Sequence, residues 1–217
     1  RRAGADAAVP RPERHGLPVA HAGPWSWPDV VASWSWEGHE GQPVTVEVYA
    51  GAAEVELLVN GRSLGRQPAG ADHRFKALFE TDYEPGDPIA VAWQGDEEVG
   101  RHVLRSATGA VRLAVQVDRT EIGAGPDELA FVEVTLVDEA GTVVTTGDRR
   151  LTVEVEGPGV LQGLASGRPD PEAPYTGPTG TTFDGRALAV IRPTGEGTIT
   201  VRVTAPATEP QELDIAV

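Results

Sequence analysis

From Trp34 to Gly65 the sequence reads WSWEGHEGQPVTVEVYAGAAEVELLVNGRSLG. It contains two segments in which apolar and polar residues alternate. The apolar positions are Val44, Val46 and Val48 in the first segment, and Val55, Leu57 and Val59 in the second. A period of two is typical of a β-strand with one buried face. Asn60-Gly61 favours a tight two-residue turn, so the stretch predicts a β-meander with one face in a core.

The composition of the whole chain favours an all-β protein with two domains. Its 217 residues suffice for two sandwiches of roughly 85 to 110 residues each. The 26 glycines and 18 prolines supply turns, and Val, Thr and Ala dominate the periodic segments. Because no segment sustains a 3.6-residue period, almost no helix is expected. We predict two consecutive immunoglobulin-like antiparallel β-sandwich domains.

The charge and the missing residue types exclude several classes of function. A formal net charge of -15 repels phosphate backbones, so no nucleic-acid partner is expected. No basic run or long apolar segment indicates a membrane partner. The absence of Cys excludes disulfides and thiolate metal sites. The chain starts at Arg1 and has no Met, so we expect it to be part of a longer product, and its cellular location is left open.

The chain divides into three predicted regions. Residues 1–22 carry three prolines without periodicity and predict an irregular linker. Residues 23–107 predict a first sandwich of five or six strands, and residues 108–217 a second of about seven. Alternating apolar residues mark two more strands of the first domain, at Phe75, Ala77 and Phe79 and at Ile89, Val91 and Trp93, and a hairpin turn follows at Gln94-Gly95-Asp96-Glu97. Residues 164–182 form a long Pro- and Gly-rich loop, which is typical of a binding or docking element.

Aromatic side chains supply the candidate binding residues. Four of the five tryptophans are Trp25, Trp27, Trp34 and Trp36. Trp34 and Trp36 are two positions apart, so on a strand they would share a face that could stack on sugar rings or meet a neighbouring domain. The alternative is that these rings fill the base of the sandwich. Tyr175, in the long loop, is a further candidate for sugar stacking.

The quoted stretch resembles the segment that follows the catalytic barrel in family 2 glycoside hydrolases of the β-galactosidase type. The matching residues are Trp34, Trp36, Gly38, Glu40-Gly41, Val48-Tyr49, Glu54 to Leu57, and Asn60-Gly61 through Leu64-Gly65. The second half is similar to a late domain of that family at Glu128 to Val132, Asp138 to Gly141, Gly157 to Gly159 and Phe183 to Ala189. It departs from the family at Ser166-Gly167-Arg168-Pro169, where an Asn-Gly-Asp-Pro-like loop is usual.

The resemblance implies that both catalytic glutamates lie in the barrel, upstream of this chain, and no residue here matches them. The residues agree with this implication. Asp127-Glu128 and Asp138-Glu139 occur in turn-like contexts without a pairing signature, although retaining glycosidases need two carboxylates in one pocket. The five histidines lack metal-ligand spacing. Asp170 and Glu172 could join a calcium site, but no twelve-residue calcium loop is present. We predict no catalytic residue, metal or cofactor.

The sequence therefore predicts a non-catalytic, C-terminal accessory fragment of a family 2 glycoside hydrolase. The resemblance implies that its parent is a retaining β-glycosidase and that its partner is the upstream catalytic barrel of the same polypeptide. Oligomer contacts are a further role consistent with this interpretation. Two alternatives stay open: a carbohydrate-binding module that uses the aromatic residues above, and a cell-surface spacer of immunoglobulin-like domains.

Overall fold

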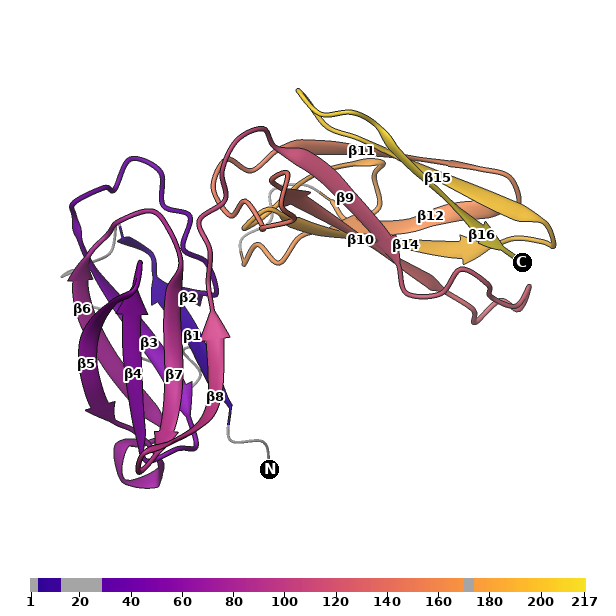
Figure 1. The fold of residues 1–217 in the computed structure, drawn as a ribbon. Helices are drawn as coiled ribbons and strands as arrows, with labels where there is room; N and C mark the ends of the chain where they lie inside the picture. The colour runs from indigo at the N-terminus through magenta and orange to yellow at the C-terminus, as the bar shows by residue number, and fades with distance from the viewer. Residues whose placement is uncertain (1–3, 13–28, 170–173) are drawn as a thin grey trace. The chain divides into compact units, whose positions relative to one another are not determined.

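A computed structural model describes residues 4–12, 29–169 and 174–217, and its strands form four antiparallel sheets of four strands each (Figure 1). The chain divides into two compact units, Arg1–Ser106 and Ala107–Val217. Each unit contains two of the sheets and one buried apolar core between them. The predicted all-β class with two sandwiches is confirmed.

The first unit builds its sandwich from strands β1 to β8. One sheet has the order β2 (Val30–Val31), β1 (Ala5–Pro10), β3 (Pro43–Ala50), β6 (Lys76–Asp82), and the other has the order β5 (Arg62–Pro68), β4 (Glu54–Val59), β7 (Pro88–Gln94), β8 (Glu97–Val103). Both predicted hairpin turns are confirmed. Asn60 and Gly61 take φ angles of 50° and 80° between β4 and β5, and Gln94 pairs with Glu97 at the end of β7 and β8.

The predicted β-meander is wrong, because β3 and β4 lie in different sheets. The segment Gly51–Ala53 takes the chain from one sheet to the other, and Ala52 is buried at this bend. The two apolar faces therefore do not lie side by side in one sheet. They belong to the same core, with Val46 on one side and Leu57 on the other.

Two further predictions in the first unit are corrected. Ala5–Pro10, predicted to be irregular, form β1, which pairs with β3 through Ala7 opposite Val48. Small residues alternate here into the core, a pattern that the prolines obscured. Residues 13–22 lie outside the described residues. Phe75, predicted to be a core position, is 53% exposed with a φ of 61°, because it follows the short 3₁₀ helix η2 (Ala71–His73) and precedes β6.

The second unit builds its sandwich from strands β9 to β16. One sheet has the order β12 (Gly159–Ala165), β14 (Arg186–Pro193), β10 (Ala130–Val137), β9 (Arg112–Val117), and the other has the order β13 (Thr179–Thr181), β11 (Arg150–Glu156), β15 (Thr198–Thr204), β16 (Gln211–Ala216). This arrangement resembles the two-sheet order of immunoglobulin domains. Leu136, Leu151, Ile191, Ile199 and Ile215 fill the core.

Candidate functional site

The tryptophan pair that the sequence marked as a binding candidate lies in the core of the first unit. Trp34 is 0% exposed and Trp36 is 3% exposed. The Trp34 indole Nε1 donates a hydrogen bond to the backbone oxygen of Glu84 at 2.8 Å. Its ring meets Tyr83 edge-on, with 5.2 Å between the ring centroids. Sugar rings have no access to indoles in this position, so these two residues do not form a stacking surface here.

Tyr83 and Ser106, which the sequence reasoning missed, hold this segment in place. The Tyr83 hydroxyl donates to the Trp34 carbonyl at 3.2 Å and accepts the Trp36 backbone N–H at 3.1 Å. The Ser106 hydroxyl donates to the same Trp34 carbonyl. These bonds satisfy backbone groups of a segment that has no strand partner there. Tyr83 lies an even number of positions after the inward-facing residues Ala77 and Phe79, and this spacing was the available signal that it also points inward.

The other candidate aromatic residues have different positions. Trp25 and Trp27 lie outside the described residues. Tyr175 is 51% exposed, and its backbone oxygen accepts the N–H of Leu164 in β12 at 2.7 Å. The contact fixes the Tyr175 backbone beside the edge of a sheet. Of the five aromatic candidates, Tyr175 is thus the one that the described structure exposes.

One carboxylate of each acidic pair noted in the sequence has structural partners. Asp138 is buried, and its carboxylate accepts the backbone N–H groups of Thr108, Ala140 and Thr142 at 2.8 to 2.9 Å. Burial disfavours its charged form, but these donors outweigh burial and lower the pKa of Asp138. Glu128 pairs with Arg119 at 3.2 Å. These carboxylates stabilise turns, and Asp138 also anchors the start of the second unit.

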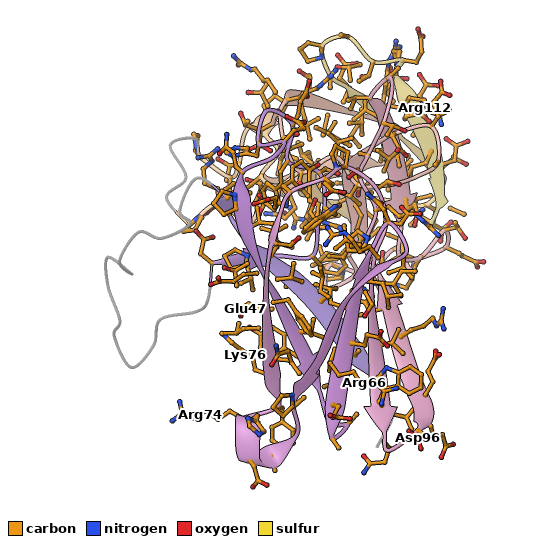
Figure 2. The ribbon with its side chains drawn as sticks, turned by 60° about the vertical axis from the view of Figure 1, so that its left-hand side comes forward. Glu47, Arg66, Arg74, Lys76, Asp96 and Arg112 are labelled. Atoms are coloured by element: carbon orange, nitrogen blue, oxygen red, sulfur yellow. The ribbon has the colours of Figure 1, made fainter. Side chains whose placement is uncertain are left out.

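A charged trio on the outer face of the β1-containing sheet was also missed by the sequence reasoning. Glu47 lies beside Lys76, whose Nζ is 2.8 Å from its Oε1 (Figure 2). The Tyr49 hydroxyl donates to the other oxygen of Glu47. Burial and this hydrogen bond raise the pKa of Tyr49 to about 12. Both oxygens of the Glu47 carboxylate thereby have a partner, and the trio ties β3 to β6.

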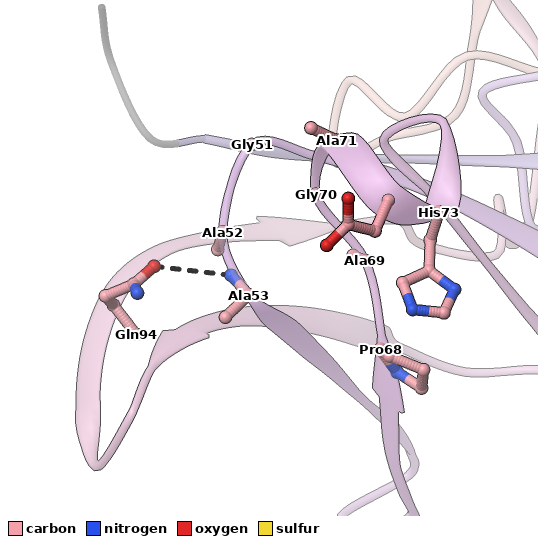
Figure 3. A pocket seen from close by; sticks show the side chains of 10 residues that line it. Gly51, Ala52, Ala53, Pro68, Ala69, Gly70, Ala71, His73 and Gln94 are labelled. Carbon is pink, nitrogen blue, oxygen red and sulfur yellow. Dashed lines mark hydrogen bonds between the residues drawn. The ribbon is translucent and has the colours of Figure 1, made fainter.

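One pocket of the first unit is an open hollow of about 370 Å³ beside η2 (Figure 3). Glycine, alanine and proline provide most of its lining, and Asp72, His73 and Gln94 are its functional side chains. The Gln94 side-chain oxygen accepts the Ala53 N–H at 3.3 Å. Asp72 is the one carboxylate among the lining residues, whereas glycoside hydrolysis needs two. The pocket therefore lacks the groups for that chemistry.

In the parts of the chain that the structure describes, no group of three or more His, Asp or Glu side chains is arranged to hold a metal ion. Across the same ranges, no helix is long and apolar enough to cross a membrane. Asp170 and Glu172, the carboxylates considered above for a calcium site, lie outside the described residues.

Two family models match the chain. A model for the glycoside hydrolase family 2 C-terminal domain 5 matches residues 113–214. A model for a domain of unknown function, DUF4982, matches residues 41–100. Beta-galactosidase BoGH2A from Bacteroides ovatus is 28% identical over 164 residues, which are 75% of this chain and 19% of that protein.

Solved structures agree with these matches. A glycosyl hydrolase family 2 member from Bacteroides cellulosilyticus superimposes with a TM-score of 0.88 at 29% identity, over 98% of this chain and 28% of that chain. A beta-glycosidase from Bacteroides vulgatus superimposes with a TM-score of 0.76 at 26% identity, over 85% of this chain and 24% of that chain. The chain thus spans less than a third of the length of each relative. These matches support the assignment of the chain to the C-terminal domains of a family 2 glycoside hydrolase, which the family's own model shows for residues 113–214.

Proposed function

We propose that this chain is a non-catalytic accessory region that supports the catalytic barrel of a larger β-glycosidase. The observation that carries the proposal is the overlap with a family 2 structure over 98% of this chain but 28% of the other. The acidic side chains support it, because Asp138 and Glu47 are engaged in internal hydrogen bonds and ion pairs. The pocket beside η2 has a single carboxylate.

The proposed substrate of the parent enzyme is a β-linked galactoside, cleaved with retention of configuration. The beta-galactosidase relative supports this choice. A second relative is described as a putative beta-glucuronidase, at 25% identity. A β-glucuronide is therefore the alternative substrate to test beside the β-galactoside. The barrel of the same polypeptide is the proposed partner of this chain.

The proposal is tested by deleting residues 1–217 from the longer polypeptide that contains them. We expect the intact enzyme to hydrolyse an aryl β-galactoside, and the deleted form to inactivate at lower temperature while its barrel keeps the catalytic groups. Adding the 217-residue chain back in trans should restore part of the lost thermal stability. Equal activity and equal thermal inactivation with and without the region would contradict a supporting role.

A further inference from the structure

The two outer faces of the second sandwich differ in chemistry. On the sheet that contains β11, charged and polar residues form cross-strand rows, Glu154 with Arg202 and Glu212, and Glu156 with Thr200 and Asp214. The sheet that contains β14 instead exposes large apolar side chains. Phe131 and Val160 are each 38% exposed and Leu188 is 37% exposed.

One row crosses this apolar face from strand to strand. Phe131 in β10 pairs with Val190 in β14, and Val190 pairs with Gly163 in β12. Directly opposite residues point to the same side of a sheet. A Cβ on Gly163 would lie 3.5 Å from the backbone oxygen of Tyr175, so the exposed Tyr175 lies beside this end of the row. Strands lie about 4.8 Å apart, so the row has Phe131 at one end, Tyr175 beside the other, and the small Val190 and Gly163 between them.

Arginines border this row, although the chain as a whole is strongly acidic. β14 alternates Arg186, Leu188, Val190 and Arg192 on the outer side, with buried residues between them. Neither Arg186 nor Arg192 has an acidic partner among the described residues. The strand positions on this face carry three arginines against one glutamate, Glu133, whereas the net charge of the chain is -15.

The third arginine of the face is already engaged. Arg112 in β9 donates to the backbone oxygens of Asp138 and Glu139. Arg186 and Arg192 are therefore the two cations available to a ligand. A guanidinium pairs in a planar, two-pronged geometry with carboxylate and with oxyanions of similar shape. An anionic ligand fits these charges.

We propose that this face binds an acidic polysaccharide, that is, a glycan that carries uronate or sulfate groups. The faces of its sugar rings would lie against Phe131, Val190 and Tyr175, because apolar C–H surfaces pack well on aromatic rings. Arg186 and Arg192 hold its anionic groups. A glycan fits better than a protein domain, since Glu133 and the arginines interrupt the apolar surface that the core of a protein interface requires.

The test measures binding of the 217-residue chain to polygalacturonate and to chondroitin sulfate by calorimetry, with neutral galactan as the uncharged comparison. We expect saturable binding to at least one anionic glycan, weakening with added sodium chloride. F131A and the double variant R186Q/R192Q should each lower the affinity about tenfold or more. The control R150Q/R202Q removes the same charge from the opposite sheet and should leave the affinity unchanged, with circular dichroism checking that every variant is folded.

Three results would overturn the proposal. They are no binding to either anionic glycan, equal binding to neutral galactan, and equal weakening by R150Q/R202Q. If neither anionic glycan binds, a contact with another protein domain becomes the better explanation of this exposed apolar face. None of these results bears on the accessory role proposed above, because the assay involves no hydrolysis and no barrel.

Discussion

The imidazole Nδ1 of His102 in β8 accepts a hydrogen bond of 2.8 Å from the backbone N–H of Ala7 in β1. The two strands belong to different sheets of the first sandwich. Ala7 is buried, so its N–H depends on this acceptor. The bond therefore joins the first described strand of the chain to the edge of the opposite sheet.

Replacing His102 by Phe should lower the free energy of unfolding by about 1–3 kcal/mol, because a buried N–H is left without an acceptor. His102→Asn is the matched control, since its side-chain oxygen can accept the same bond and should recover part of the loss. Denaturant unfolding measures the stability, and hydrogen exchange measures protection of the Ala7 amide. An Ala7 amide that stays fully protected in the Phe variant would refute the role of His102.

Tyr49 should ionise near pH 12, and not at the value near 10 of a free tyrosine. Its pKa is raised in the folded state, so its contribution to stability is complete below about pH 10 and is lost as pH rises through about 12. Phenolate absorbance measures the titration, with Tyr49→Phe identifying the signal. Glu47→Gln should lower the pKa of Tyr49, since it removes the negative charge beside the hydroxyl. A Tyr49 that titrates near 10 in the unmodified chain would contradict the geometry.

Asp138→Asn should cost about 1–3 kcal/mol of unfolding free energy at neutral pH, because an amide cannot accept all three N–H groups. The pKa of Asp138 is lowered by folding, so its stabilisation is present above about pH 4, the unfolded value, and is lost as pH falls through the lower, folded value. The variant should thus unfold with a weaker pH dependence in acid. Glu139→Gln, an exposed neighbour, serves as the control, and equal losses in both variants would argue against the Asp138 network.

Gly185→Ala should destabilise the second sandwich by about 2–4 kcal/mol. Gly185 has a φ of 71°, and an added Cβ would lie 2.1 Å from the backbone oxygen of Val144. Gly95 has a similar φ of 62° with nothing within 4 Å, so Gly95→Ala isolates the conformational cost, about 1 kcal/mol. Thermal unfolding compares the two. If both variants lose the same stability, the close approach at Val144 is not a constraint.

Much of the fold was predictable because short-range patterns determine it. The turn at Asn60-Gly61 needs positive φ angles that these residues readily adopt, and it forms as expected. Strand pairing was harder, since alternation shows that β3 and β4 each bury one face but not that they face each other across a core. In β7 the larger residues Ile89, Val91 and Trp93 also alternate, but the strand turns its other face, with Ala90 and Ala92, into the core. Alternation alone does not show which face of a strand is buried.

The candidate site was less predictable than the fold. Trp34 and Trp36 were expected to share a face, but whether that face was exposed depended on Tyr83 and Ser106, which are distant in sequence. The surface row from Phe131 to Tyr175 combines residues from three strands and a loop. Only the register between those strands brings it together, and the apolar alternation within each strand does not show how the strands are aligned with one another.

Hydrolysis of an aryl β-galactoside and an aryl β-glucuronide by the isolated 217-residue chain, compared with the longer polypeptide that contains it, decides whether these domains act on substrate themselves. We expect no release of the aryl group above the buffer rate from the chain, and turnover of at least one substrate by the longer polypeptide. Turnover by the chain alone, retained after purification to constant specific activity, would contradict the claim that these C-terminal domains are non-catalytic.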